Sequence, residues 1–361
     1  METAIKEKVR KRIITCSDGT WNKPGDIDGG VGITTNVQKI FEGICNEDGE
    51  GIKQIKYYDQ GVGSTGSKLR RIIDGATGYG LDENILDAYK FIIWNYEQGD
   101  EIYLFGFSRG AYTARSLAGI IRKVGLLKNN DLKRIKEAYA LYRDTSIKPD
   151  DGDAIKFRDM YSQPNANVKF IGVWDTVGSL GIPFMVMQNK SKYQFHDTTL
   201  SSHVDFAYHA LAVDEQRKNF MPTLWRESEN LADKNPNQKM EQRWFPGVHS
   251  NIGGGYPKAG LSDVALKWMM DKAAETGLAF EKKYLDEKIK PNDADMLYNS
   301  NKFPFSLLGR HVRAIKELPD SNETVDKSVF ERMLLDFRPD PLYKPANVKS
   351  IHQYSTNASS G

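Results

Sequence analysis

The sequence predicts an α/β fold in which helices cover both faces of a mostly parallel sheet. Apolar, β-prone runs alternate with amphipathic segments along most of the chain, and this alternation is typical of parallel sheets. Several of the runs are apolar throughout, as expected for strands that are buried on both faces. The chain has 361 residues, which is enough for a large buried core in one elaborated domain or in two.

The alternation consists of strand candidates and helix candidates that are separated by short turns. The strand candidates are residues 11–17, 52–59, 101–105, 167–175 and 241–249. The helix candidates are residues 34–45, 81–99, 110–124, 131–144 and 261–277. Residues 201–217 also look helical, so His203 and His209 within them are expected to pack or to cap.

The composition argues against several classes of protein. The formal net charge is +2, so the whole-chain charge favours neither nucleic acid nor an anionic membrane as partner. The two cysteines, Cys16 and Cys45, form neither a disulfide framework nor a zinc pattern, which fits a reducing compartment. The first residues lack the pattern of a secretory signal, and no run approaches the roughly 18 apolar residues of a transmembrane segment. We therefore expect a chain that is soluble and cytoplasmic as synthesised.

A serine lies in a tight turn between a strand candidate and a helix candidate. Residues 106–110 read Gly-Phe-Ser-Arg-Gly, which is the G-x-S-x-G form of a nucleophile elbow. Such a turn holds the Ser108 hydroxyl at the C-terminal rim of the sheet, and the glycines let strand and helix approach each other. The pattern is short enough to occur by chance, in which case Ser108 would only cap the helix after a glycine turn. The preceding strand and the following helix favour the catalytic interpretation.

A serine nucleophile requires a general base, because its hydroxyl is a poor nucleophile at neutral pH. His249 is the candidate base. It is the one histidine of the six that ends an apolar strand candidate and opens a glycine-rich loop. That loop can carry the imidazole over the rim of the sheet toward Ser108. The alternative is a structural histidine that bonds to its own loop.

The base in turn requires an acid that accepts its N–H and stabilises the imidazolium. Asp175 ends the strand candidate 167–175, so it should emerge at the same edge of the sheet as Ser108. Its alternative role is to bond the backbone of its own turn. Asp214 is the rival acid, but its neighbours Glu215 and Arg217 favour a surface salt bridge at a helix end. We therefore favour Asp175.

Acyl transfer also requires hydrogen-bond donors for the oxyanion. One donor should be the backbone N–H of Arg109, the residue after the serine. The second should come from the loop after the first strand, where the N–H of Gly19 or Thr20 is the candidate. Asp18 in that loop would repel an oxyanion unless its side chain faces away and bonds its own loop.

Seven separated motifs, in this order, resemble the α/β-hydrolase family that includes the type VI secretion phospholipase effectors. They are SDGTWN, TNVQKI, YYDQGVG, GFSRGAYTAR, GVWDTVGS, HALAVDE and FPGVHSNIGGGY, spread over about residues 11–280. The resemblance puts Ser108, Asp175 and His249 on the triad positions of the family. It implies esterase or phospholipase activity on the acyl esters of glycerophospholipids. It also implies use as an antibacterial toxin held in check by an immunity protein, exported by a secretion apparatus without a signal peptide.

Together these features predict an α/β-hydrolase-like serine esterase, most specifically a phospholipase or lipase. We expect no cofactor, and a lipid or another carboxylic ester as substrate. The catalytic domain is expected over residues 1–285, with insertions, followed by a C-terminal extension over residues 286–361. The alternative function, from another class, is a binding or toxin-associated protein that keeps the fold without turnover.

Three further stretches suggest other sites. Residues 61–68 nearly match a phosphate-binding loop, but the lysine and the serine at its end are in reversed order, so we expect no nucleotide binding. Residues 148–155 contain three aspartates without the spacing of a calcium loop, and paired-cysteine or H-E-x-x-H metal motifs do not occur. Residues 181–188 are apolar and rich in methionine, and they could line an acyl pocket, form a lid or pack in the core.

Overall fold

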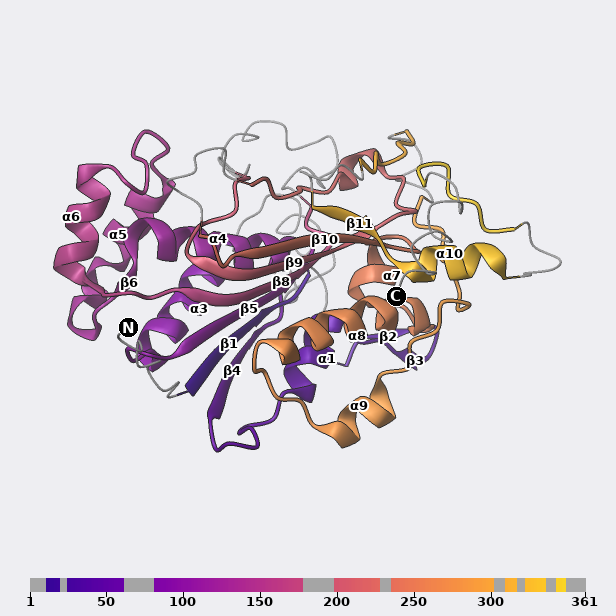
Figure 1. Cartoon of the computed structure of the whole chain (residues 1–361), viewed down its shortest axis with the longest axis horizontal. Helices are drawn as coiled ribbons and strands as arrows, with labels where there is room; N and C mark the ends of the chain where they lie inside the picture. Colours follow the sequence, from indigo (N-terminus) through magenta and orange to yellow (C-terminus); the bar gives the residue numbers. More distant parts are fainter. Residues whose placement is uncertain are drawn as a thin grey trace, which may run out of the picture.

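The computed structural model describes residues 11–19, 25–61, 81–177, 198–227, 235–301, 309–316, 322–335 and 342–348. In these residues seven strands form one sheet in which every neighbouring pair is parallel (Figure 1). The strands are β1 (Lys11–Ser17), β4 (Lys53–Asp59), β5 (Glu101–Phe107), β8 (Val168–Trp174), β9 (Val204–Ala212), β10 (Lys239–Phe245) and β11 (Glu323–Val325). The predicted α/β fold is therefore confirmed.

The order of the strands across the sheet is β11-β10-β9-β8-β5-β1-β4. The chain passes from β1 to β4 on one side of β1, and the next strand of the sheet, β5, lies on the other side. In open α/β sheets the carboxyl ends of strands at such a reversal form a crevice in which ligands bind. The residues that follow β1 and β5 lie at this place, and Ser108 is one of them.

Helices cover both faces of the sheet, as the sequence predicts (Figure 1). One face is covered by α3 (Leu81–Asn95), α4 (Arg109–Val124), α5 (Ile135–Arg143) and α6 (Gly152–Tyr161). The other face is covered by α1 (Asn36–Gly43), α8 (Gly260–Glu275) and α9 (Lys282–Lys288). The remaining elements are β2 (Ile27–Asp28), β3 (Val31–Gly32), β6 (Leu126–Leu127), η1 (Asn129–Arg134), β7 (Ser162–Gln163), η3 (Lys218–Phe220), α7 (His249–Gly253) and α10 (Lys327–Leu334).

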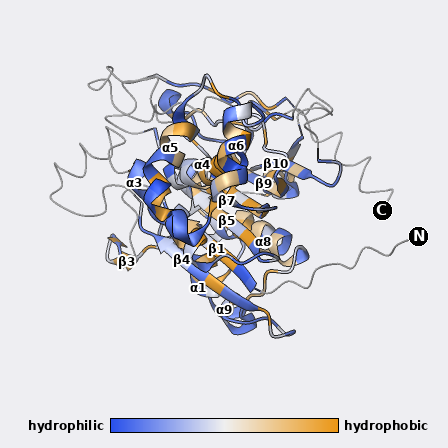
Figure 2. Cartoon of the chain, turned by 90° about the vertical axis from the view of Figure 1, so that its left-hand side faces the viewer, coloured by the Kyte–Doolittle hydropathy of each residue, from blue (hydrophilic) through white to orange (hydrophobic). Residues whose placement is uncertain are grey.

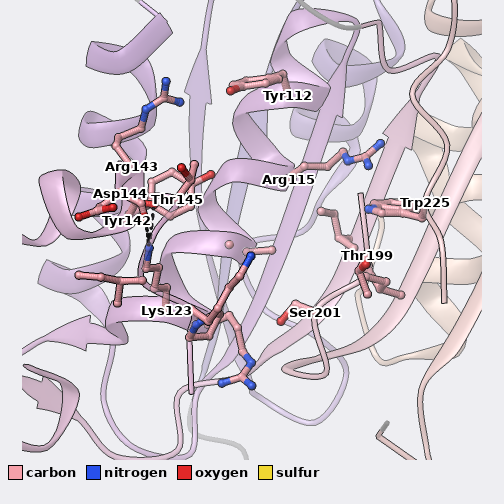
Figure 3. Close-up of a pocket in the computed structure, with 18 residues that line it drawn as sticks. Tyr112, Arg115, Lys123, Tyr142, Arg143, Asp144, Thr145, Thr199, Ser201 and Trp225 are labelled. Carbon is pink, nitrogen blue, oxygen red and sulfur yellow. Dashed lines mark hydrogen bonds between the residues drawn. The ribbon is translucent and has the colours of Figure 1, made fainter. Parts of the chain in front are cut away.

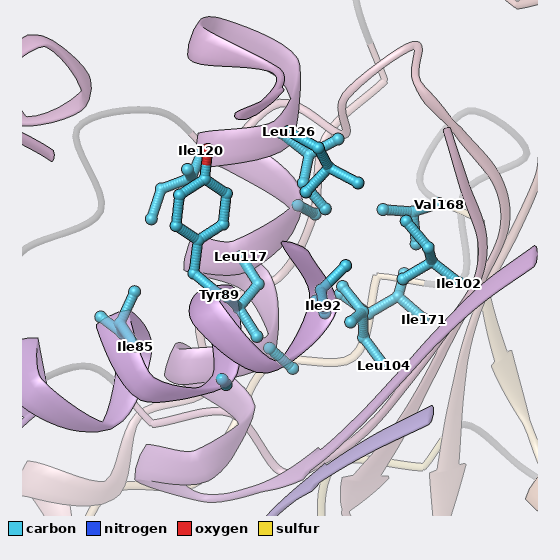
Figure 4. Close-up of a cluster of buried hydrophobic side chains, with 14 of the residues drawn as sticks. Ile85, Tyr89, Ile92, Ile102, Leu104, Leu117, Ile120, Leu126, Val168 and Ile171 are labelled. Atoms are coloured by element: carbon cyan, nitrogen blue, oxygen red, sulfur yellow. The ribbon is translucent and has the colours of Figure 1, made fainter. Parts of the chain in front are cut away.

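The hydrophobic core consists of one layer on each side of the central strands. Figure 4 shows the first layer, in which side chains of α3 and α4 pack against those of β5 and β8. Tyr89 and Leu117 from the helices and Leu104 and Ile171 from the strands belong to it. In Figure 2 the hydrophobic colours concentrate in the interior, between the helices of the two faces. Burial on both faces explains why the central strands are apolar throughout.

One element was predicted wrongly. Residues 201–217 were expected to be helical, but residues 204–212 form β9, which pairs with β8 on one side and with β10 on the other. Its residues alternate between the two core layers: Ala207 packs in the first, whereas Tyr208 and Ala210 pack in the second. Pairing with two neighbouring strands and burial on both faces outweigh the alanines of this segment, which favour a helix.

Other boundaries differ by a few residues. β5 runs to Phe107 rather than to residue 105, because Gly106 and Phe107 still pair with Val173 and Trp174 of β8. The helix expected over 81–99 ends at Asn95. The helix expected over 131–144 divides into the 3₁₀-helix η1 and α5, and the strand expected over 241–249 ends at Phe245.

The chain beyond residue 285 adds to the same sheet. β11 pairs with β10, and the side chains of α10 pack against that edge of the sheet. Val329 and Phe330 of α10 form a third apolar cluster with Leu211 of β9 and Trp244 of β10. Residues of the predicted C-terminal extension therefore contribute both to the sheet and to the core.

Candidate active site

Ser108 lies between β5 and α4 in a backbone conformation that is rare for a residue with a side chain. Its φ is 57° and its ψ is −115°. Such conformations cost free energy and persist where the surrounding structure holds them in place. The Ser108 N–H donates to the carbonyl oxygen of Trp174 at the end of β8, at 3.0 Å, which fixes the turn against the neighbouring strand.

The two glycines of the turn are required by close approach of the backbone. A Cβ atom on Gly106 would lie 2.3 Å from the carbonyl oxygen of Gly110. A Cβ atom on Gly110 would lie 2.0 Å from the carbonyl oxygen of Ser17, at the end of β1. Neither distance is compatible with a side chain, so α4 can begin this close to the sheet because both positions are glycine. The predicted strand–turn–helix context of Ser108 is present.

The structure brings Ser108, His249 and Asp175 together. Nε2 of His249 lies 2.9 Å from Oγ of Ser108, and Nδ1 of His249 lies 2.6 Å from Oδ2 of Asp175. The three side chains come from the ends of β5 and β8 and from the first residue of α7, at the same edge of the sheet. Ser108 is 8% exposed and His249 6%, whereas Asp175 is 0% exposed. The acid is thus fully enclosed, whereas the serine and the histidine each keep a small exposed fraction.

Four hydrogen bonds hold the Asp175 carboxylate. Besides His249, Oδ1 accepts from the Ala212 N–H at 3.1 Å and from Arg313 at 2.6 Å, and Oδ2 accepts from Arg313 at 3.0 Å. Arg313 is 1% exposed and also donates to the carbonyl oxygens of Ala212 and Phe220. Burial alone would raise the pKa of Asp175, but the charge of Arg313 and the bond to His249 lower it well below its ordinary value. Asp175 is therefore ionised at neutral pH.

The His249 imidazole is enclosed by aromatic rings. Its centroid lies 4.7 Å from that of Phe107 and 5.0 Å from that of Phe220. Burial lowers the pKa of His249, against the opposing effect of its bond to Asp175. The neutral imidazole is thus the favoured form, as a general base requires.

The backbone of His249 is held by Glu215, a carboxylate buried in the loop after β9. One oxygen of Glu215 accepts from the His249 N–H at 3.2 Å. Glu215 also accepts from Ser300 Oγ and forms a bidentate pair with Arg217. The sequence predicts a surface salt bridge between Glu215 and Arg217 at a helix end. The pair exists, but Glu215 is buried, and the segment is a loop that supports the imidazole.

Asp214 was also expected at a surface helix end, and this expectation is wrong. It lies in the same loop after β9, where its Oδ2 accepts from the Gly247 N–H at 2.7 Å and from the Tyr343 hydroxyl at 2.8 Å. Burial raises the pKa of Asp214 to about 6. These bonds tie the loops after β9 and β10 to the C-terminal segment, and both go to groups other than His249.

His209 of β9 and His203, which precedes the strand, have structural surroundings. His209 is fully buried; its Nε2 accepts from the Thr176 N–H at 3.1 Å, and burial lowers its pKa to about 3. This bond fixes the residue that follows Asp175. His203 lies before β9, where burial lowers its pKa to about 4. Both imidazoles are neutral at physiological pH, and His209 packs in the core as predicted, although in a strand rather than a helix.

The predicted oxyanion donors lie at the N-terminal end of α4 and in the loop after β1. Arg109 is the first residue of α4, and the N–H groups of the first turn of a helix point toward its N-terminal end, where Ser108 lies. The Gly19 N–H donates to Oδ1 of Asp18 at 2.6 Å, so it is engaged within its own loop. Thr20 lies outside the described residues.

The Asp18 side chain bonds its own surroundings, as the oxyanion hypothesis requires. Besides Gly19, it accepts from the hydroxyls of Thr35 and Tyr58 at 2.5 and 2.6 Å. Burial raises the pKa of Asp18 to about 6, against these three hydrogen bonds. Asp18 thus joins the loop after β1 to the start of α1 and to β4.

The other predicted sites are only partly within the described residues. Of residues 61–68 only Gly61 is described, and residues 181–188 lie outside the description altogether. Asp150 pairs with Arg122, and Asp151 accepts from the Lys148 N–H as the residue before α6. Within the described ranges, histidine, cysteine and carboxylate side chains do not gather into a group that could hold a metal ion.

Two residues around this site were missed by the sequence analysis. Arg313 belongs to no motif, and it lies 138 positions from Asp175 along the chain. Glu215 was noted, but only as a surface residue. No periodicity or short pattern in the sequence marks either side chain, because their partners come from distant segments.

In the described part of the chain, no helix combines the length and the hydropathy that crossing a bilayer requires.

An uncharacterized protein of Saccharomyces cerevisiae, YEL023C, is 32% identical over 231 residues, which cover 58% of this chain and about a third (32%) of the yeast protein. A crystal structure of an uncharacterized protein from Pseudomonas aeruginosa superposes with a TM-score of 0.45 at 17% identity, over 79% of this chain and 49% of that chain. A family model described as "T6SS, Phospholipase effector Tle1-like, catalytic domain" matches residues 11–272. Because this model covers most of the chain, the protein belongs to the Tle1-like family of phospholipase effector catalytic domains.

Proposed function

We propose that this protein is a serine hydrolase that cleaves carboxylic esters of the phospholipid type. The observation that carries the proposal is the continuous hydrogen-bonded line from Ser108 through His249 to Asp175. Each contact is within hydrogen-bonding distance, and the lowered pKa values of Asp175 and His249 favour an ionised acid and a neutral base. The family adds the substrate class, because it is a family of phospholipase catalytic domains.

In this mechanism Ser108 Oγ attacks the ester carbonyl carbon while its proton passes to Nε2 of His249. The resulting imidazolium is stabilised by the Asp175 carboxylate at Nδ1. The tetrahedral intermediate then collapses, the C–O bond to the alcohol breaks, and the alcohol takes the proton from Nε2. A water molecule attacks the acyl-enzyme in the same way and releases the carboxylic acid and the free serine.

The oxyanion would be stabilised at the N-terminal end of α4. The Arg109 N–H is the first proposed donor, and the aligned dipoles of this helix of 16 residues favour negative charge at the same point. The second donor is proposed to come from the loop after β1. Gly19 and Thr20 are its two candidates, and Gly19 would have to release the Asp18 carboxylate to serve.

Arg313 is proposed as a positioning residue rather than a catalytic one. It forms two bonds to the Asp175 carboxylate and so fixes the plane in which Oδ2 meets the imidazole. Its positive charge also offsets part of the negative charge of Asp175, which limits how strongly Asp175 stabilises the imidazolium. Arg313 thus helps to orient the His249 imidazole through Asp175 and to keep it neutral.

A fluorophosphonate probe tests the proposal, because it reacts covalently with an activated serine and not with an ordinary one. The wild-type chain should be labelled at Ser108, and Ser108→Ala should not be labelled. Ser116→Ala is the matched control, since Ser116 is a buried serine two turns further along α4. This variant should be labelled like the wild type.

Wild-type protein that has not been exposed to the probe should also release fatty acid from mixed micelles of phosphatidylcholine or phosphatidylethanolamine, and prior labelling should abolish this release. If folded wild-type protein is not labelled at all, the fold is kept without turnover, and the binding or toxin-associated function takes the place of this proposal. If it is labelled and cleaves short soluble esters but no phospholipid, the serine chemistry stands and the lipid substrate does not.

A further inference from the structure

A cavity of about 250 Å³ lies along one side of α4. Five pieces of chain line it: α4, the end of α5 with the turn that follows, Ile171 of β8, residues 199–201, and Trp225 (Figure 3). Ser108, Asp175 and His249 are not among the residues that line it. The cavity is therefore distinct from the candidate active site, although both are built on the same helix.

The cavity has a solvent-exposed rim and a buried floor. Thr145 and Thr199 are exposed at the rim, on opposite sides in Figure 3. Ala118 and Trp225, by contrast, are buried lining residues. A concave site with this gradient of exposure has the form of a small-molecule pocket.

Positive charge dominates the lining. Asp144 is the one carboxylate among the described residues of the lining, and it accepts from the N–H and the hydroxyl of Ser146 within its own turn. Asp150, which does not line the cavity, pairs with Arg122. Two more carboxylates act on these cations from outside the lining, Asp82 on Arg143 and Asp151 on Lys123. Within the described lining itself, five cationic residues accompany one carboxylate. The cationic residues are Arg115, Arg122, Lys123, Arg143 and Lys148.

Two of these cations are buried. The Arg115 guanidinium lies 4.8 Å from the centroid of the Trp225 ring and donates to the carbonyl oxygen of Thr223. Lys123 Nζ donates to backbone carbonyls at the end of α5, as the dashed line in Figure 3 shows. Burial lowers the pKa of Arg115 to about 9 and lowers the pKa of Lys123 as well. Because burial removes hydration from both cations, an anion in the cavity would stabilise them.

From this lining we infer that the cavity is a binding site for a small phosphate ester. A phosphate monoester carries up to two negative charges and three strong acceptor oxygens. The arginines supply planar pairs of donors that match phosphate oxygens, and the lysines add point charges. The hydroxyls of Tyr142, Thr199 and Ser201 can donate to the remaining oxygens. The Trp225 ring provides a surface for the organic part of the ligand.

The size of the cavity restricts the ligand further. A volume of 250 Å³ equals that of about eight water molecules in the liquid. This is enough for a compound such as glycerol phosphate and too little for a whole phospholipid. A fatty acyl chain fits the chemistry poorly, because it offers no acceptor oxygens to the arginines and lysines of the lining.

Isothermal titration calorimetry with sn-glycerol 3-phosphate tests the inference on the full-length chain. The Ser108→Ala variant is used, so that neither turnover nor the outcome for the proposed hydrolase affects the result. We expect saturable binding with one site per chain. Thr199→Glu, Lys148→Gln and Arg143→Gln should each weaken it by about tenfold, because each removes or opposes one charge-assisted interaction.

The rim variants are chosen because Thr199 and Lys148 are exposed and Arg143 is only half-buried, so the core is left intact. Lys267→Gln is the matched control: it also removes one positive charge, but from an exposed residue of α8 on the other face of the sheet. Lys267→Gln should bind like the parent protein. Unchanged circular dichroism and melting temperature should accompany every variant.

The ester that the cavity binds can come from two sources, and two further titrations distinguish them. Binding of glycerophosphocholine as tight as that of glycerol 3-phosphate would indicate a lipid head group, since its phosphate is a diester. Binding restricted to glycerol 3-phosphate and inorganic phosphate would indicate a free phosphate monoester. Either result supports a phosphate site.

Three results would overturn the inference: no saturable heat with any of the phosphate compounds, binding that Thr199→Glu and Arg143→Gln leave unchanged, or preferential binding of octanoate. None of these results depends on whether the fluorophosphonate probe labels Ser108. Failure of this inference and failure of the proposed hydrolase are therefore distinguishable.

Discussion

The two nitrogens of the His249 imidazole face groups that are held in place in different ways. Nε2 faces Ser108, which is fixed by its own neighbours in the chain, the end of β5 and the start of α4. Nδ1 faces Asp175, which is fixed by Arg313 from 138 residues further along. The conformation of the serine turn depends on adjacent residues, Gly106 to Gly110, which pack against β1 and β8. The charge of the acid, by contrast, is compensated by a side chain from a distant segment.

This difference separates two kinds of sensitivity. The serine side stores backbone strain in a turn that glycine contacts with β1 and α4 hold in place. Removing the Ser108 hydroxyl leaves those contacts intact, so it should affect chemistry and not folding. The acid side consists of a buried charge and its buried counter-charge, and breaking such a pair costs stability as well. Substitutions on the acid side should therefore change rate and stability together.

The largest expected effect comes from removing the base. His249→Ala and Ser108→Ala should each lower kcat on a soluble ester by roughly 10³–10⁶-fold, and the two losses should not add, because the residues act as one unit. Asp175→Asn should cost about 10⁴-fold, since it favours the wrong imidazole tautomer. Initial rates of ester hydrolysis on folded protein measure all three.

Additive losses would contradict the prediction that Ser108 and His249 act as one unit. A double variant Ser108→Ala/His249→Ala whose rate falls by the product of the single losses would mean that the two side chains act separately. Melting temperatures provide the second readout. Ser108→Ala should melt close to the wild type, whereas Asp175→Asn should melt lower because it leaves Arg313 without its full counter-charge.

A smaller effect is expected at Arg313. Arg313→Met should lower kcat/KM by about 10²-fold, as expected when a supporting residue lets a reacting group move by about an ångström. It should also move the acidic limb of the pH–rate profile. In the wild type burial lowers the pKa of His249, so activity should persist to below pH 6.5 and fall as the imidazole becomes protonated.

Without the guanidinium, Asp175 would stabilise the imidazolium more strongly, so the acidic limb of Arg313→Met should lie at higher pH than that of the wild type. Arg313→Lys keeps a positive charge, and its limb should lie closer to the wild-type position even though the bidentate geometry is lost. A purely structural role for Arg313 predicts a lower melting temperature with an unmoved limb, and that result would contradict the positioning role.

The same contrast explains how much of the site the sequence could predict. The Ser108 turn could be predicted from Gly106 and Gly110, because a sharp turn requires small residues at positions adjacent in the sequence. His249 and Asp175 could be placed at one sheet edge, because parallel strands end together. Each of these inferences needs only neighbours in the chain and the polarity of the strands.

The parts that were missed depend on tertiary environment. A helix was predicted for β9 because alanine favours helices, whereas the burial of this segment on both faces of the sheet depends on its neighbours. Arg313 and Glu215 could not be assigned, because their partners are set by how distant loops pack over the sheet edge. Asp214 was put at a surface because nothing in its neighbourhood shows that Tyr343 would cover it.

The smallest effect is expected at Asp214, the rival acid. Both of its hydrogen bonds, from the Gly247 N–H and the Tyr343 hydroxyl, go to one oxygen, so an asparagine can keep both through its amide oxygen. Asp214→Asn should therefore leave the rate of ester hydrolysis within a few-fold of the wild type.

Its effect on stability should depend on pH. Burial raises the pKa of Asp214 to about 6, whereas an aspartate in the unfolded chain titrates near 3.9. Between about pH 4 and pH 6 the unfolded state binds fewer protons at this site, so the wild type loses stability there as the pH rises. An asparagine side chain does not titrate and carries no such penalty, so the melting temperature of Asp214→Asn relative to the wild type should increase from pH 4 to pH 6 and then level off. An inactive Asp214→Asn beside an active Asp175→Asn would exchange the two roles and make Asp214 the acid that orients His249.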